Sequence, residues 1–206
     1  MKKEVGVSIV LAFLFWVSCA NATPIDVNIY SDTTISSGEY GTVNIYDTPP
    51  DQTTVTMTGG TAESVWAYNS SIFNMQNGNV SFVVSVFDNS TAVISGGSIQ
   101  YLQLSYSGVA SLSGGSINGS LSTGGMATVH FYGKNFNCIP HAGGGWLITG
   151  NWDDAISSPF TVWYRAGYSE PIPGSFDSPI TLHIVPEPIT LSFLLIGILG
   201  IRKFRG

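Results

Sequence analysis

Four copies of one short phrase organise this chain: Met57-Thr58-Gly59-Gly60, Met75-Gln76-Asn77-Gly78, Ile94-Ser95-Gly96-Gly97 and Leu112-Ser113-Gly114-Gly115. Their first residues lie 18, 19 and 18 positions apart (75−57, 94−75 and 112−94). A short, nearly constant period predicts a solenoid, because each copy forms one coil that buries its apolar face only against a neighbouring coil.

Alignment of the copies predicts columns of side chains inside this solenoid. The first position is apolar in every copy, the fourth is glycine, and the sixth is Ala62, Val80, Ile99 or Ile117. The ninth position gives Val65, Val83 and Leu102, whereas in the last copy Leu121 comes one residue later, so the register slips there. Residues that favour turns follow each strand, at Asn69-Ser70-Ser71, Asp88-Asn89-Ser90, Ser107-Gly108 and Thr123-Gly124-Gly125.

Between these corners the side chains alternate with a period of two, as in residues 81–87 and 99–104, which indicates strands. We therefore expect an all-β fold: a short right-handed β-solenoid (β-helix) with N- and C-terminal caps. Residues 57–133 form the repeats, and residues 23–56 form the N-terminal cap and first coil. Four coils rise about 19 Å at a strand spacing of about 4.8 Å.

Residues 134–184 are expected to form the C-terminal β cap. Strands are predicted at residues 146–150, 160–164 and 180–184, with a loop at residues 138–145. Trp146, Trp152 and Trp163 fall in this region, so we expect an aromatic lid over the last coil.

The N-terminus has the three parts of a secretory signal peptide, here residues 1–22. Basic residues precede an apolar run at residues 5–17, and Ala20 and Ala22 provide the small side chains that signal peptidase needs. A lipidation box ending at Cys19 and an uncleaved N-terminal anchor are the alternatives. Removal of the signal helix leaves Cys138 as the only cysteine, so no intrachain disulfide is expected.

The C-terminus, residues 185–206, combines a rigid motif, an apolar segment and a basic end. Pro186, Glu187 and Pro188 precede the apolar residues 189–201, and Arg202, Lys203 and Arg205 follow. As a helix, those thirteen residues extend about 20 Å, which is short of a bilayer core of about 30 Å. Flanking residues must help this transmembrane helix to span, and its basic end should stay on the cytoplasmic side.

This arrangement resembles the PEP-CTERM sorting signal of Gram-negative bacteria. The resemblance implies recognition of Pro186-Glu187-Pro188 by an exosortase, a membrane cysteine protease-transpeptidase, followed by release or transfer to the surface. Segments 131–133, 147–153 and 180–182 loosely resemble the closing segments of similar surface proteins. A plain C-terminal membrane anchor is the alternative.

The charge balance of the body argues against nucleic acid as a partner. Only 10% of the 206 residues are charged. Between the two terminal segments the chain has eleven carboxylates but only two basic residues, Lys134 and Arg165. The body is therefore strongly acidic and repels phosphate backbones.

Candidate catalytic residues are sparse, and we expect no enzyme activity, metal or cofactor. Cys138 lies near His130 and His141 in sequence, but no orienting third residue can be named. Asp153-Asp154 is the only adjacent acidic pair and is more typical of a solvated turn than of a calcium site. Across the repeats, Glu63 and Asp88 occupy different positions of successive copies, so no acid-base pair is expected there.

We therefore predict an exported structural or adhesive protein of the cell surface or extracellular matrix, whose partners are the export machinery, an exosortase and the membrane. The alternative is a polysaccharide-binding module or a weak glycan-active enzyme that uses exposed aromatics such as Trp66, Tyr101 or Tyr106. One exposed aromatic row would favour binding, and a row beside two carboxylates would favour catalysis. An ice-binding array at Thr54, Thr56 and Thr58 is disfavoured because later copies do not repeat it.

Overall fold

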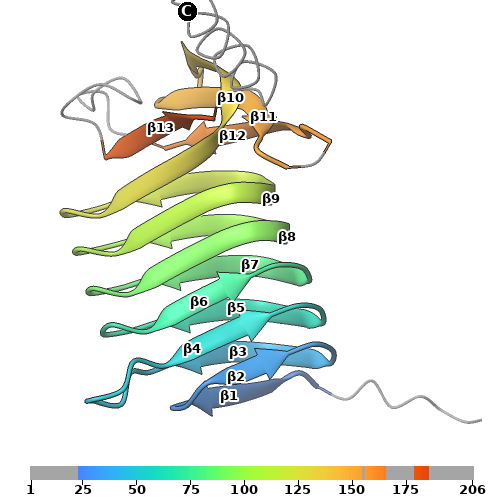
Figure 1. Ribbon diagram of the computed structural model, residues 1–206, viewed down its shortest axis with the longest axis vertical. Coiled ribbons are helices and arrows are strands. Elements are labelled where there is room, and N and C mark those ends of the chain that lie inside the picture. Colours follow the sequence, from blue (N-terminus) through green and yellow to red (C-terminus); the bar gives the residue numbers. More distant parts are fainter. Residues whose placement is uncertain (1–22, 155, 166–178, 186–206) are drawn as a thin grey trace, which may run out of the picture.

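The computed structural model describes residues 23–154, 156–165 and 179–185, and every regular element in these ranges is a β-strand. The strands stack as about six coils of a β-solenoid, which confirms the all-β solenoid predicted from the repeat (Figure 1). Three predicted features lie outside the described residues: the signal peptide at residues 1–22, the sorting motif at residues 186–188 and the apolar segment at residues 189–201. Within the described residues, no helix is long and apolar enough to cross a membrane.

Each coil contributes one strand to each of two parallel stacks. The long-strand stack contains β1 (Ile25–Ile29), β3 (Glu39–Ile45), β5 (Thr61–Ala67), β7 (Asn79–Val86) and the C-terminal halves of β8 (Thr91–Leu104) and β9 (Val109–Thr123). The short-strand stack contains β2 (Thr33–Ile35), β4 (Thr54–Met57), β6 (Ile72–Met75), the N-terminal halves of β8 and β9, and the start of β10 (Thr128–Pro140).

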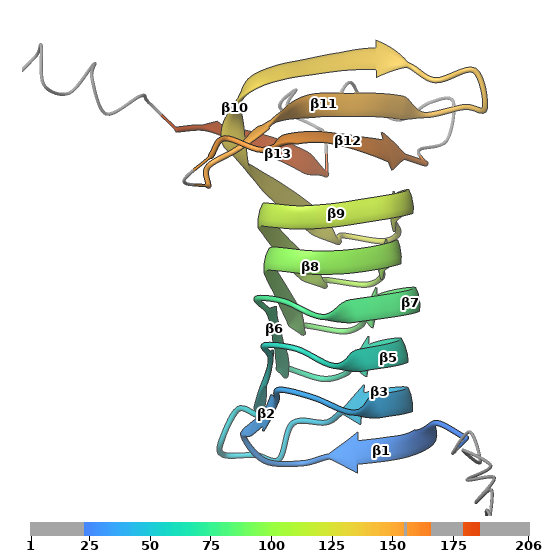
Figure 2. The ribbon, with the colours of Figure 1, turned by 90° about the vertical axis from the view of Figure 1, so that its right-hand side faces the viewer.

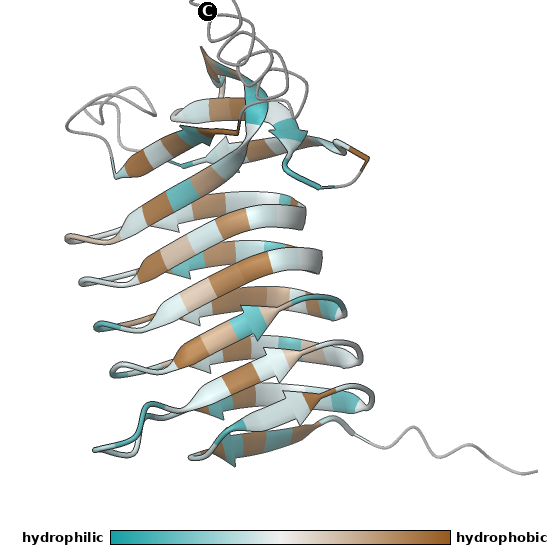
Figure 3. Ribbon diagram, viewed as in Figure 1, coloured by the Kyte–Doolittle hydropathy of each residue, from teal (hydrophilic) through white to brown (hydrophobic). Residues whose placement is uncertain are grey.

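The core is a set of columns in which every coil places an apolar side chain on that of its neighbour. Backbone pairing aligns the column Ile35, Met57, Met75, Ile94, Leu112 and Phe131, and each of these side chains is buried. The predicted sixth-position column, Ala62 to Ile117, is confirmed by the same pairing. Figure 3 shows the resulting alternation of hydrophobic and hydrophilic residues along the strands.

Left-handed backbone fixes both corners of the coil. The fourth-position glycines all have positive φ, between 78° and 103°, as does Gly38 one coil earlier. At the opposite corner Asn69, Asp88, Tyr106 and Gly125 have φ from 54° to 69°. The predicted Asn and Asp turns are thus confirmed, since these residues tolerate left-handed backbone better than most.

The solenoid begins one coil earlier than the four predicted copies. Ile35-Ser36-Ser37-Gly38 is a further copy, 22 residues before Met57, and Ile35 stacks on Met57. The spacing is longer because residues 47–53 form a loop at the corner, which disguises the period. Residues 23–56 therefore form two coils, and among the described residues no strand pairs with the outer edge of β1.

The predicted register slip occurs twice. Leu121 continues the column of Val65 and Leu102, as expected, but in β7 the aligned residue is Val84 and the predicted Val83 is wrong. A register shift between Val80 and Val83 adds one residue to β7. Strict alternation would bury Phe82, whereas the shift turns its side chain outward, 53% exposed.

The C-terminal strands close the far end of the solenoid (Figure 2). β10 leaves the short-strand stack and pairs antiparallel with β11 (Trp146–Trp152), which pairs antiparallel with β12 (Pro159–Tyr164), and β13 (Ile180–Ile184) pairs with the start of β10. The loop predicted from Cys138 starts later, since β10 runs to Pro140. Trp152 is 2% exposed, stacks on Phe160 at 3.9 Å and donates its indole N–H to Gly115 O at 2.9 Å, so the predicted aromatic lid is confirmed.

Candidate functional site

Three exposed aromatic side chains lie on the outer face of the long-strand stack, on successive coils. Trp66 of β5 and Tyr101 of β8 are each 38% exposed, and Phe82 of β7 lies between these strands. Sequence reasoning selected Trp66 and Tyr101 but missed Phe82, because the register shift that exposes it interrupts the alternation. Backbone pairing aligns Trp66 with Ser85 and Gln103 rather than with Tyr101, and the exposed Tyr106 sits at a corner. The row beside the cavity therefore consists of Phe82 and Tyr101.

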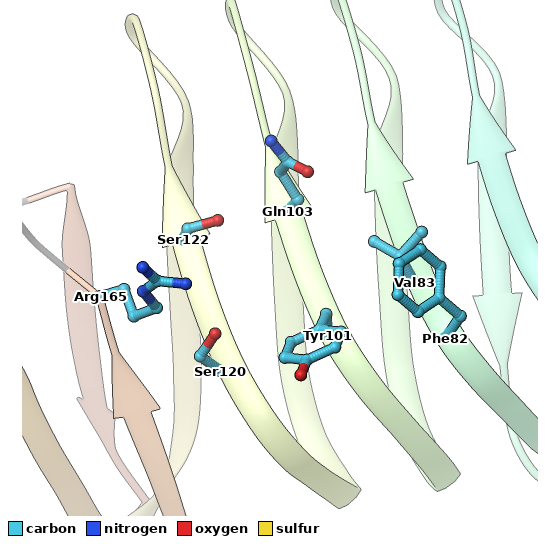
Figure 4. A pocket seen from close by; sticks show the side chains of 7 residues that line it. All are labelled: Phe82, Val83, Tyr101, Gln103, Ser120, Ser122 and Arg165. Carbon is cyan, nitrogen blue, oxygen red and sulfur yellow. The ribbon is translucent and has the colours of Figure 1, made fainter.

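A cavity of about 490 Å³ opens beside this row, on the outer face of β7, β8 and β9. It is lined by Phe82, Val83, Tyr101, Gln103, Ser120, Ser122 and Arg165 (Figure 4). The rings of Phe82 and Tyr101 meet edge to face, with centroids 5.9 Å apart and planes at 84°. None of the described residues that line the cavity is acidic, so it combines aromatic surface, neutral hydrogen-bonding groups and one cation.

Arg165 is held at the rim of this cavity by its neighbours in the cap. Its backbone N–H donates to Leu121 O at 2.8 Å, which extends the pairing of β12 with β9 by one residue. The guanidinium carbon lies 5.4 Å from the centre of the Trp163 ring, a cation–π contact. In Figure 4 the guanidinium extends over β9 between Ser120 and Ser122.

Serine side chains form the floor between the aromatics because the parallel register aligns rows across the coils. One row is Thr42, Ser64, Val83, Tyr101, Ser120 and Trp163. Ser120 is only 6% exposed and lies in this row between two large residues, Tyr101 and Trp163. A small residue flanked by two large ones leaves a hollow rather than a flat surface.

A second cavity, of about 520 Å³, shares Phe82 with the first and faces the N-terminal coils. Glu39 and Glu63 both line it, together with Tyr40. The two carboxylates lie 24 residues apart (63−39) and come together because β3 and β5 are neighbours. Both are exposed, whereas a general acid usually needs burial to stay protonated at neutral pH.

The cysteine and histidines near the cap do not assemble into a nucleophile and base. His130 on β10 faces His183 on β13, with Nδ1 and Nε2 3.1 Å apart, while His141 stacks on Trp163 and accepts a hydrogen bond from the Gly143 N–H. Cys138 pairs with Ile148 on β11, and burial raises the pKa of its thiol. A raised pKa disfavours the thiolate that nucleophilic chemistry requires.

The acidic pair in the cap behaves as a turn, as predicted. Asp154 Oδ1 accepts a hydrogen bond from the Ser158 N–H at 2.8 Å, and hydrogen bonding from Ser158 lowers the pKa of this carboxyl. Among the described residues, no group of three or more His, Cys, Asp or Glu side chains could hold a metal ion.

The threonine array of β4 extends to Thr34 of the preceding coil, which pairs with Thr56, but it does not continue into β6. Thr54 pairs with Ile72 and Thr56 with Asn74, so the next coil does not repeat the spacing of hydroxyls. One corner instead carries a ladder of four rings, Tyr30, Tyr46, Tyr68 and Phe87, with successive centroids 5.0–5.3 Å apart and planes within 15°. These rings present their faces to one another, so the ladder stabilises the stack and leaves few ring faces for a ligand.

No known protein family, curated protein or solved structure matches this chain.

Proposed function

We propose that this chain is an exported, non-enzymatic bacterial surface or matrix protein that adheres to extracellular polysaccharide. The observation that carries the proposal is the exposed pair Phe82 and Tyr101 in a cavity that is also lined by amide, hydroxyl and guanidinium groups. Aromatic faces pack against the C–H groups of sugar rings, and neutral polar groups bond to their hydroxyls. Such a face can bind a repeating polymer without any catalytic group.

The proposal includes the route to the surface. A signal helix directs export of the right-handed β-solenoid, and a transmembrane helix at residues 189–201 then holds it until an exosortase acts at Pro186-Glu187-Pro188. The terminal sequence patterns support this route. The capped end of the solenoid leads into the sorting segment, so the first coils would be the part farthest from the membrane.

Sorting is tested by the intact mass of the protein exported from the native host. The wild type should lose the segment beyond the motif, whereas a Pro186→Ala/Glu187→Ala/Pro188→Ala variant should retain it. An Arg202→Lys/Arg205→Lys variant keeps the basic end and should still be processed. If the wild type retains residues 189–206, the sorting proposal is rejected and the protein is a membrane-tethered solenoid.

Adhesion is tested by retardation of the exported protein in gels that contain the host's extracellular polysaccharide. Wild type should be retarded, and Tyr101→Ala and Phe82→Ala should each migrate faster. Tyr106→Ala is a matched control because it removes an exposed ring outside the row. Equal migration of wild type with and without the polysaccharide would reject the adhesive role.

The presence of Glu39 and Glu63 in one cavity favours a second candidate, a glycan-active enzyme. Two carboxylates at a glycosidic bond can act as acid and base or nucleophile. This candidate predicts release of new reducing ends from the host polysaccharide, and loss of that release in Glu39→Gln and Glu63→Gln. If the wild type releases no new reducing ends, the enzyme candidate is rejected and the binding proposal remains.

A further inference from the structure

We propose that the cavity between Phe82, Tyr101 and Arg165 binds sugar units that carry a carboxylate, as in an acidic, uronate-containing polysaccharide. The inference rests on the proposed adhesion to polysaccharide and specifies its ligand class. It follows from the charge, shape and polarity of this one cavity.

The charge argument starts from the scarcity of cations in the body. The described residues contain nine carboxylates, Asp26, Asp32, Glu39, Asp47, Asp51, Glu63, Asp88, Asp153 and Asp154, but only two Lys or Arg, Lys134 and Arg165. An acidic protein repels acidic polymers at long range. Binding of such a polymer therefore requires a local cation, and Arg165 provides one in a cavity whose described lining contains no carboxylate.

Arginine is well suited to this role. The guanidinium presents its N–H donors in a planar fork that matches both oxygens of a carboxylate. Contact with the Trp163 ring and the backbone bond to Leu121 restrict where the Arg165 side chain can lie. A partly pre-organised donor loses less conformational entropy on binding.

The aromatic residues select a sugar over a simple anion. Backbone pairing between neighbouring strands places four residues in one row across the sheet: Val83 of β7, Tyr101 of β8, Ser120 of β9 and Trp163 of β12. Three strand spacings of about 4.8 Å make this row about 14 Å long, which exceeds one sugar ring. A uronate unit can place its carboxylate at Arg165, its hydroxyls near Gln103 and Ser122, and the ring of the next unit against Tyr101 or Phe82.

The test compares two polymers that differ only in charge: polygalacturonate, and the same polymer with its carboxyl groups reduced to primary alcohols. Binding of the exported protein is measured by calorimetry at low ionic strength. The wild type should bind polygalacturonate at least ten-fold more tightly, and added salt should reduce the difference because it screens the ionic contact. Arg165→Gln should lose the preference, and Arg165→Lys should retain only part of it.

The controls separate the effect of the Arg165 charge from loss of folding and from nonspecific binding. Lys134→Gln removes the same formal charge outside the cavity and should keep the preference, while Tyr101→Ala should weaken binding of both polymers. Thermal unfolding checks that every variant is folded. Equal binding of the two polymers, or a preference unchanged in Arg165→Gln, overturns this inference and leaves the adhesive role standing. If wild type binds neither polymer nor the host polysaccharide, both proposals fail.

Discussion

At the scale of single residues, the glycine in the fourth position of each copy is the strictest requirement of the coil. Gly97 has φ of 79°, and a Cβ at this position would lie 2.5 Å from Met75 Cε and 2.8 Å from Gly78 O. Both the backbone conformation and the neighbouring coil exclude a side chain there. The repeat therefore conserves glycine from copy to copy within the chain for a steric reason.

We expect Gly97→Ala to lower the free energy of unfolding by about 1–3 kcal/mol, through backbone strain and displacement of the preceding coil. The matched control is Gly124→Ala, where the nearest atom to an added Cβ is 3.9 Å away and φ is not positive. That variant should change stability by no more than about 0.5 kcal/mol. Urea unfolding of both proteins measures the difference, and equal values would refute the steric argument.

At the scale of elements, β13 is held to the solenoid through β10, and two histidines face each other across this pairing. Burial, and secondarily His183, lower the pKa of His130. Tyr132 stacks on the His183 ring at 4.5 Å, so the neighbouring strand packs closely around the pair. Protonation of His130 would place a positive charge against the His183 ring, across the 3.1 Å contact between His130 Nδ1 and His183 Nε2.

Stability should consequently depend on pH in a defined direction. The unfolded chain protonates His130 near the ordinary pKa of about 6.5, and the folded chain does so only at lower pH. The stability is therefore full above about pH 6.5 and falls as the pH decreases through the lowered folded-state pKa. Urea unfolding between pH 8 and 5.5 should show this loss in wild type and in His141→Gln, but less of it in His130→Asn. An identical pH profile in His130→Asn would contradict this assignment.

We expect the stability of the cap to depend most on one large buried side chain, Trp152. Trp152 packs against both Phe131 of the last coil and Phe160 of β12, which also contact each other, and its indole N–H donates to Gly115 O. Trp152→Ala should lower the free energy of unfolding by about 3–5 kcal/mol, as expected for a buried aromatic. Trp66→Ala is the control, because Trp66 is partly exposed and its loss should cost much less. A similar cost for both would show that the cap does not rely on this contact.

At the scale of the whole molecule, the two ends of the solenoid differ. The C-terminal end is covered by the β10–β12 cap, whereas the outer edge of β1 pairs with no described strand and Ile25 and Tyr30 are 69% and 57% exposed. Each coil of a solenoid is stabilised mainly by its neighbours, so the first coil lacks half of its support. Asp26 and Asp32 on this coil accept hydrogen bonds from the Thr42 and Thr54 N–H groups of the second coil, so both carboxylates tie the first coil to the stack.

Hydrogen exchange should therefore be graded along the axis. Amides of β1 and β2 should exchange about ten-fold or more faster than those of β7 and the C-terminal half of β8, because local opening starts at the unsupported end. Mass spectrometry of exchanged peptides measures this. In Trp152→Ala, the amides of β9 should also exchange faster. Uniform protection from β1 to β9 would mean that the solenoid opens as a single unit.

The all-β solenoid, its core columns, its turn residues and its aromatic lid could all be predicted from the sequence. These features follow from local spacing and alternation, which neighbouring residues alone encode. The coil of Ile35 escaped detection because the loop at residues 47–53 stretched the period to 22 residues. The alternation pattern did not predict the exposure of Phe82, because one extra residue in β7 reverses the alternation.

The candidate site, in contrast, is assembled by contacts between residues far apart in the sequence. Phe82, Tyr101 and Arg165 are separated by 19 and 64 residues (101−82 and 165−101), and no local pattern relates them. They meet because parallel stacking places β7, β8 and β9 side by side and the cap returns β12 to β9. Glu39 and Glu63 line one cavity for the same reason, because β3 and β5 are neighbouring strands. Which residues share a face of a solenoid depends on the register between coils, and long-range backbone pairing sets that register.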